Sequence, residues 1–214
     1  MFENDHLIHC IEQDETYMHS EKLHCFIQEL LATCKLQLNQ MNAVAVSEGP
    51  GSYTGLRIGV SAAKGLCFAL EIPLIAVSTL RIITNAAMDQ LKDQSAVDYF
   101  IPLIDARRME AYSCSFDNGL KVIRPLSSVI IDEHSFDKEL NAGKVLFYGS
   151  GMEKMRNLYL KHKSARFLEQ VSASSRYMGK LANEKYKADD FENMVYFEPL
   201  YHKKFIATTP KKVL

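Results

Sequence analysis

The alternation of apolar and polar residues over residues 43–77 predicts a strand, a loop, a helix and a second strand. Residues 43–47 form a short valine-rich run of the kind found in buried strands, and a Gly-Pro-Gly turn interrupts the pattern directly after it. From Thr54, which we predict as the N-cap, to about Leu70 the apolar residues recur with helical spacing. Residues 74–77 are the next apolar run. This order predicts a βαβ unit.

The same pattern extends over the rest of the chain. Further helices are predicted over residues 17–38, 78–91, 132–142, 152–160 and 172–186, and further strands over residues 7–11, 99–104, 111–116, 120–123, 129–131 and 144–148. Asn118-Gly119 predicts a type I′ turn between two of these strands. Alternating strands and helices are typical of an α/β protein.

The first residues predict half of a hairpin. Asn4-Asp5 is a turn signal, and residues 7–11 suit the strand that leaves the turn. Only Met1, Phe2 and Glu3 come before it. We therefore expect the strand that enters this turn to be absent.

The helix that follows Thr54 carries an unusual number of small residues. Gly55 and Gly59 form a stripe with Ala62 or Ala63, beside an apolar stripe that suits the face of a sheet. Each glycine inside a helix costs about 1 kcal/mol relative to alanine. Close approach of another backbone offsets such a cost, and the neighbour is either a helix of this chain or a helix of a partner.

The loop before this helix is a candidate anion site. Its glycines fail the dinucleotide fingerprint, because Thr54 stands at the third glycine position, and Lys64 lacks the neighbours of a Walker loop. Free backbone N–H groups at a helix start still attract anions. The candidate residues for an anion or nucleotide loop are Gly49, Gly51, Ser52 and Thr54. A tight structural turn without a ligand is the alternative.

Two other segments raise the same choice between structure and chemistry. Gly149-Ser150-Gly151 is a second strand-to-helix glycine turn, which we interpret as structural in the first place. Asp105, Arg107, Arg108 and Glu110 gather charge at the end of a predicted strand. They suit acid–base work, but a salt-bridged strand end is the simpler interpretation.

Composition and charge exclude several classes of protein. The formal net charge of −1 gives no basic surface of the kind that binds nucleic acid unaided. Five scattered cysteines without a Cys-x-x-Cys pair indicate reduced thiols, and His19 and His24 are five residues apart, so no metal site is expected. The N-terminus has no signal-peptide pattern and no apolar run reaches membrane length. We expect a cytoplasmic protein.

Residues 48–59, Glu-Gly-Pro-Gly-Ser-Tyr-Thr-Gly-Leu-Arg-Ile-Gly, followed by Lys64-Gly-Leu, resemble the signature of the TsaB family of tRNA threonylcarbamoyladenosine biosynthesis proteins. Residues 19–23, 102–112 and 195–205 are similar to other segments of that family. The resemblance implies an α/β fold of two actin-like, ribonuclease-H-like subdomains with mixed sheets flanked by helices. The first subdomain would be residues 1–97, completed by residues 190–214, and the second residues 98–189. The resemblance also implies an apolar first strand before the hairpin, and we expect this chain to lack that strand.

The resemblance further implies a function. TsaB-like proteins are non-catalytic subunits that pair with the catalytic subunit TsaD and the ATPase TsaE, and that form homodimers when alone. The complex modifies the adenosine next to the anticodon in tRNAs that read codons starting with A. We therefore expect no catalytic residue, no cofactor and no metal. The resemblance and the small-residue stripe place the partner interface on two helices, with the candidate residues His19, Ser20, Leu23, Ile27, Gly55, Arg57, Gly59, Ala62, Ala63 and Leu66.

Two other classes of protein stay open. An ATP-binding enzyme of the actin-like superfamily would need a phosphate loop in the first hairpin, which this sequence does not offer. A peptidase would need a nucleophile set, and neither Gly-x-Ser-x-Gly nor a Ser-His-Asp or Cys-His arrangement stands out. Whether a nucleotide or tRNA touches this chain directly is not decided by the sequence.

Overall fold

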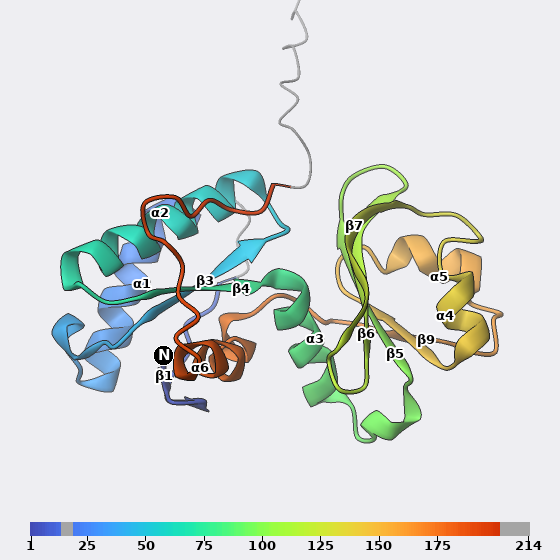
Figure 1. The fold of residues 1–214 in the computed structure, drawn as a ribbon, viewed down its shortest axis with the longest axis horizontal. Helices are drawn as coiled ribbons and strands as arrows, with labels where there is room; N and C mark the ends of the chain where they lie inside the picture. Colours follow the sequence, from blue (N-terminus) through green and yellow to red (C-terminus); the bar gives the residue numbers. More distant parts are fainter. Residues whose placement is uncertain (14–18, 202–214) are drawn as a thin grey trace, which may run out of the picture.

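The computed structural model describes residues 1–13 and 19–201, and its elements gather around two sheet regions (Figure 1). The helices are α1 (His19–Cys34), α2 (Tyr53–Leu70), α3 (Thr79–Gln90), α4 (Asp137–Ala142), α5 (Glu153–Tyr159) and α6 (Gly179–Lys187). The strands are β1 (Phe2–Glu3), β2 (His6–Leu7), β3 (Val44–Gly49), β4 (Leu74–Ser78), β5 (Tyr99–Asp105), β6 (Glu110–Asp117), β7 (Val122–Ile130), β8 (Val145–Tyr148) and β9 (Ala165–Leu168). Short 3-10 helices cover Leu38–Gln40, Gln94–Ala96 and Ser175–Tyr177.

The first region is built on the parallel pair of β3 and β4, with Val44 opposite Leu74. Helices α1 and α2 lie on one side of this pair and α6 on the other (Figure 1). Ala63 and Cys67 of α2 are buried against Leu74, which closes one small core. The second small core joins β4, α3 and α6. The βαβ unit predicted over residues 43–77 is therefore present.

The second region is a mixed five-stranded sheet in the order β7-β6-β5-β8-β9. Strand β5 is parallel to β8 and antiparallel to β6, and β8 is parallel to β9. Helix α3 covers one face of the sheet, and α4 with α5 covers the other (Figure 1). The side chains of Phe100, Phe136, Phe147 and Tyr148 are fully buried in the two resulting cores. The predicted α/β class with mixed, helix-flanked sheets is confirmed.

The C-terminal segment returns to the first region. The backbone N–H of Glu192 donates to the carbonyl of Leu74 at 2.9 Å, and that of Leu200 donates to Glu48 at 2.7 Å. In Figure 1 the segment after α6, drawn in red, runs from α6 across to α2. The described end of this segment, residues 190–201, therefore contacts the first sheet region, residues 202–214 fall outside the described part, and the division into subdomains at residues 97 and 190 stays a prediction. Helix α6 belongs by sequence to the predicted second subdomain, residues 98–189, but it packs on β4 of the first sheet region.

Three local predictions, about a helix cap and two turns, are wrong. The N-cap of α2 is Ser52, whose Oγ accepts from the N–H of Gly55 at 3.3 Å, and not Thr54. Strand β1 does enter the first turn, because Phe2 and Glu3 pair with Leu7 and His6. The hairpin after β6 is not a type I′ turn, since its left-handed residue is Leu120 (φ 60°). There the Asp117 carboxylate accepts from Gly119 and Lys121 and stabilises a different turn.

The two short strands predicted over residues 120–123 and 129–131 are one strand, β7, which pairs with β6 along its length. Pro125 lies inside it, as an edge strand allows. Strand β9 was not predicted. None of the described helices is long and apolar enough to span a bilayer.

Candidate functional site

Two glycine turns meet across a cleft of about 790 Å³ between the two regions. Pro50 and Gly51 come from the turn after β3, and Gly149 and Ser150 come from the turn after β8. Gly149 has φ +96°, and a Cβ atom at this position would lie 2.5 Å from the carbonyl oxygen of Leu103. Glycine is therefore required there by sterics. The turn at 149–151 holds β8, β5 and α5 together, as the structural interpretation predicts.

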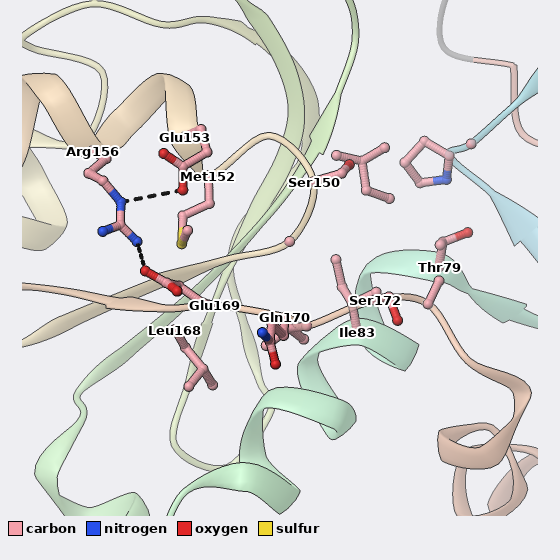
Figure 2. Close-up of a pocket in the computed structure, with 16 residues that line it drawn as sticks. Thr79, Ile83, Ser150, Met152, Glu153, Arg156, Leu168, Glu169, Gln170 and Ser172 are labelled. Atoms are coloured by element: carbon pink, nitrogen blue, oxygen red, sulfur yellow. Dashed lines mark hydrogen bonds and ion pairs between the residues drawn. The ribbon is translucent and has the colours of Figure 1, made fainter. Parts of the chain in front are cut away.

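The charged groups of the cleft are paired with one another. The guanidinium of Arg156 lies 3.3 Å from Glu153 Oε1 and 2.5 Å from Glu169 Oε1 (Figure 2). Toward the other side of the cleft lie Thr79 and Ser172. The hydroxyl of Thr79 is hydrogen-bonded to the hydroxyl of Ser47 at 2.6 Å. The polar groups of the cleft are therefore hydroxyls on one side and, on the other, the guanidinium of Arg156 with its charge balanced by two glutamates.

The charge cluster after β5 is a salt-bridged strand end. Lys154 Nζ donates to Asp105 Oδ1 at 2.7 Å and to the carbonyl of Glu110 at 2.7 Å. The hydrogen bond from Lys154 lowers the pKa of Asp105, which keeps this carboxylate ionised and acceptor-only. Arg107 and Arg108 form the turn to β6 with φ values of 70° and 50°. The simpler interpretation of this cluster is therefore favoured.

Two of the four residues of the candidate anion loop make structural contacts within the chain. Gly49 is buried with φ +113°, and a Cβ atom there would lie 3.1 Å from the carbonyl oxygen of Leu200. Ser52 is used as the helix cap. Gly51 lines the cleft, while Thr54 is exposed on the first turn of α2. The four predicted residues thus run from the end of β3 to the first turn of α2, and their contacts position α2 and the C-terminal segment.

Six of the predicted interface residues lie on the inner side of the two helices. They line an apolar groove of about 580 Å³ between α1, α2, β3 and α6: Leu23, Ile27, Gly59, Ala62, Ala63 and Leu66. A Cβ atom placed on Gly59 would meet only Val46 Cγ2, at 3.8 Å. No other described helix brings its backbone within 4 Å of such positions on Gly55, Gly59 or Gly65. The close helix contact expected from the glycine stripe is therefore not made inside the described chain.

Of the four remaining candidates, two belong to α2 and two to α1. Arg57 is exposed and donates to the Tyr53 hydroxyl at 2.9 Å. Phe68 follows on the same helix side with 78% of its surface exposed, and Gly65 beside it has open space around its Cβ position. Phe68 was not singled out from the sequence, because one phenylalanine in a helix full of apolar residues gives no sign that it faces outward. His19 and Ser20 lie in the first turn of α1, and their side chains are outside the description.

The thiols and acids of the described chain show no metal-binding geometry. No group of three His, Cys, Asp or Glu side chains converges there. Cys67 and Cys114 are buried, and desolvation raises the pKa of Cys114 to about 12. Such a thiol stays protonated near neutral pH and is a packing residue.

Comparison with known families shows which family the chain belongs to. The family model described as "TsaD: tRNA N6-adenosine threonylcarbamoyltransferase" matches residues 15–210, which is most of the chain. The chain belongs to this family.

Curated relatives confirm the TsaB resemblance carried by residues 48–59. The chain is 38% identical over 94 residues to the tRNA threonylcarbamoyladenosine biosynthesis protein TsaB of Haemophilus influenzae, which covers 44% of this chain and 38% of the relative. It is 34% identical over 105 residues to TsaB of Escherichia coli, covering 48% and 44%. For TsaB of Bacillus subtilis the identity is 36% over 118 residues, covering 54% and 47%. The matched region spans less than half the length of each of these three relatives.

Solved structures confirm the fold. YeaZ from Pseudomonas aeruginosa superposes with a TM-score of 0.71 at 22% identity, covering 87% of this chain and 86% of YeaZ. A second structure, described as an uncharacterised protein with similarity to peptidase YEAZ from the same organism, also gives 0.71, at 21% identity. At this identity the likeness establishes the architecture alone.

Proposed function

We propose that this chain is a non-catalytic subunit in the synthesis of threonylcarbamoyladenosine in tRNA. It binds and activates a catalytic subunit of the TsaD type, with a TsaE-type ATPase in the same assembly. The modified base is the adenosine next to the anticodon in tRNAs that read codons starting with A. The observation that carries the proposal is the identity of 34–38% to three TsaB relatives, beside the TsaB-like motif of residues 48–59.

The geometry of the cleft supports a subunit without catalysis. In the cleft, Arg156 is paired with Glu153 and Glu169, and at the nearby end of β5 Asp105 is paired with Lys154. One oxygen of each of these carboxylates is in an ion pair with a neighbouring cation, which supports a structural role over that of a general base.

The contact with the partner is formed by the pair of helices α1 and α2. The inner side of this helix pair packs over the groove, and Gly55 and Arg57 belong to the partner-facing part. The residues on the inner side are Leu23, Ile27, Gly59, Ala62, Ala63 and Leu66. Phe68 and the open position at Gly65 extend this surface. An exposed phenylalanine beside a glycine gives a partner both an apolar anchor and room for close approach. Alone, the chain uses the same surface for a homodimer.

A reconstituted modification reaction tests the proposal. The chain, a TsaD-type subunit, a TsaE-type ATPase and unmodified tRNA are combined with a source of threonylcarbamoyl-adenylate, and the modified nucleoside is measured by mass spectrometry. We expect no product from the chain alone and product when the catalytic subunit is present. Robust modification by the lone chain would show that it is itself the transferase.

A matched pair of variants tests the surface. Gly65→Arg introduces a long side chain where the described structure leaves open space, so the fold is expected to tolerate it. Gly65→Ala changes the helix propensity without reaching into the partner. We expect the arginine variant to lose co-purification with the catalytic subunit and the alanine variant to keep it. Equal pairing by both would remove α2 from the interface.

A further inference from the structure

The segment that follows α6 runs along α2 in the direction opposite to that helix (Figure 1). One backbone hydrogen bond joins it to β4 near the end of α2, and another joins it to the end of β3 near the start of α2. Between these two points Lys64 Nζ donates to the carbonyls of Val195 and Phe197, at 3.4 and 3.1 Å. Residues 191–201 are called the C-terminal strap below.

The middle of the strap is a tight turn with its own hydrogen bonds. Asn193 Oδ1 accepts from the N–H groups of Val195 at 3.0 Å and Tyr196 at 3.3 Å. The carbonyl of Asn193 accepts from the N–H of Phe197 at 2.8 Å. Met194 and Phe197 pack inward, against the small core between α2 and β4. The backbone that carries residues 195 and 196 is therefore held in place from several sides.

This turn presents apolar side chains to solvent beside another exposed apolar side chain. Tyr196 is 81% exposed and Val195 is 76% exposed, and Phe68 of α2 is 78% exposed. These are the three highest values among the large apolar side chains that the structure describes. Phe68 lies one helical turn after Lys64, the residue that holds the strap. Single exposed apolar residues are ordinary, but a group of three in one place indicates an interaction surface.

The helix pair α1 and α2 offers a small surface without the strap. Seven residues of α2 and six of the described part of α1 are exposed. A stable interface uses about 20–30 residues on each side, so the helix pair falls short even if all of its exposed residues take part. The strap adds seven exposed residues beside α2. The helix pair and the strap together reach the lower end of the range.

We propose that the catalytic subunit covers the C-terminal strap as well as the helix pair, and that Val195, Tyr196 and Phe68 are the apolar anchors of this contact. The inference rests on the proposed function, because the occupant is the partner named there. The partner surface is apolar, with a hydrogen-bond acceptor for the hydroxyl of Tyr196, since a buried phenol needs one. Lys64 is then a positioning residue, which fixes the strap to α2.

A calorimetric titration of the full chain with the catalytic subunit tests the contact. Because both side chains are exposed, the double variant Val195→Ser, Tyr196→Ser is expected to keep the fold, which its Tm checks. We expect its Kd to rise at least tenfold. The control is Leu160→Ser directly after α5, where the side chain is 63% exposed, and it should leave the Kd unchanged. An unchanged Kd in the double variant, while Phe68→Ser weakens pairing, would overturn this inference and leave the proposed function standing.

Amide hydrogen exchange tests the same contact without a substitution. The N–H groups of Val195 and Tyr196 lie in an exposed turn, and their exchange should slow at least tenfold when the catalytic subunit is added. Unchanged exchange would overturn the inference. If the double variant lost only the homodimer and kept its affinity for the catalytic subunit, a second copy would be the occupant, and the inference would be overturned. If the unaltered chain did not bind the catalytic subunit, the proposed function would fail and this inference with it.

Discussion

The hydroxyl of Tyr148 on β8 donates to Thr84 Oγ1 on α3 at 2.8 Å, and both side chains are fully buried. The hydroxyl of Thr84 in turn donates to the carbonyl of Leu80 at 2.6 Å. Burial raises the pKa of Tyr148 well above its usual value, so this phenol stays a donor. The short chain of hydrogen bonds fixes α3 to the five-stranded sheet.

This arrangement predicts unequal costs for removing the two partners. Tyr148→Phe removes one bond and leaves no donor unpaired, so we expect a loss of about 1 kcal/mol in the free energy of unfolding. Thr84→Val leaves a buried phenol without an acceptor, and we expect a loss of about 1–3 kcal/mol. Urea unfolding of both variants and of the double variant checks this. The double variant should be less destabilised than the sum of the two, and strict additivity would contradict the coupling.

Glu48, at the end of β3, predicts a pH dependence. Desolvation by burial raises the pKa of its carboxyl group, and nearby Lys185 only partly opposes this. The folded state therefore holds the proton more tightly than the unfolded state, so stability falls as the pH rises from the ordinary glutamate value through the folded pKa. Glu48→Gln should gain stability over the parent at pH 7 and much less at pH 4. Urea titrations at the two pH values measure this, and a larger gain at pH 4 would contradict it.

Gly149 predicts a strong steric effect. Its φ of +96° disfavours any residue with a Cβ atom, and the Cβ position lies 2.5 Å from the Leu103 carbonyl oxygen. We expect Gly149→Ala to lower the free energy of unfolding by at least about 1–3 kcal/mol. Gly65→Ala is the control, because the same change inside α2 should stabilise by up to about 1 kcal/mol. Thermal unfolding of the pair should therefore move in opposite directions.

Much of this fold could be predicted because its signals are local. The run from β3 to β4 follows from valine-rich strands, a Gly-Pro-Gly turn and helical periodicity, all within about 35 residues. Strand β9 was not predicted, because its four residues include the charged Arg166 and give no clear strand pattern. The strand is defined by its pairing with β8. Leu120 could not be predicted as the left-handed residue, since the Asp117 carboxylate decides the turn.

The candidate site was harder to predict than the fold. Helical periodicity groups Gly55 and Gly59 with Ala62 or Ala63 in one stripe of α2, but it does not say whether that stripe faces the sheet or a partner. The structure places Gly59, Ala62 and Ala63 in the groove beside β3. The meeting of the turns at 49–51 and 149–151 across one cleft depends on how two sheets lie together, which no local pattern encodes.

Phe68 provides the sharpest test of the partner surface, because a second exposed apolar residue serves as its control. Phe68 on α2 is 78% exposed and Ile130 at the end of β7 is 73% exposed, so neither contributes much to the core. Burying a phenylalanine in a contact is worth about 1.5–3 kcal/mol, which is roughly 10- to 100-fold in Kd. We expect Phe68→Ser to weaken the homodimer, measured by light scattering, and pairing with the catalytic subunit, measured by titration, each by at least tenfold. Ile130→Ser should leave both unchanged. The same loss in the two variants would indicate a general solubility effect, and no loss in Phe68→Ser would move the interface away from the outer side of α2.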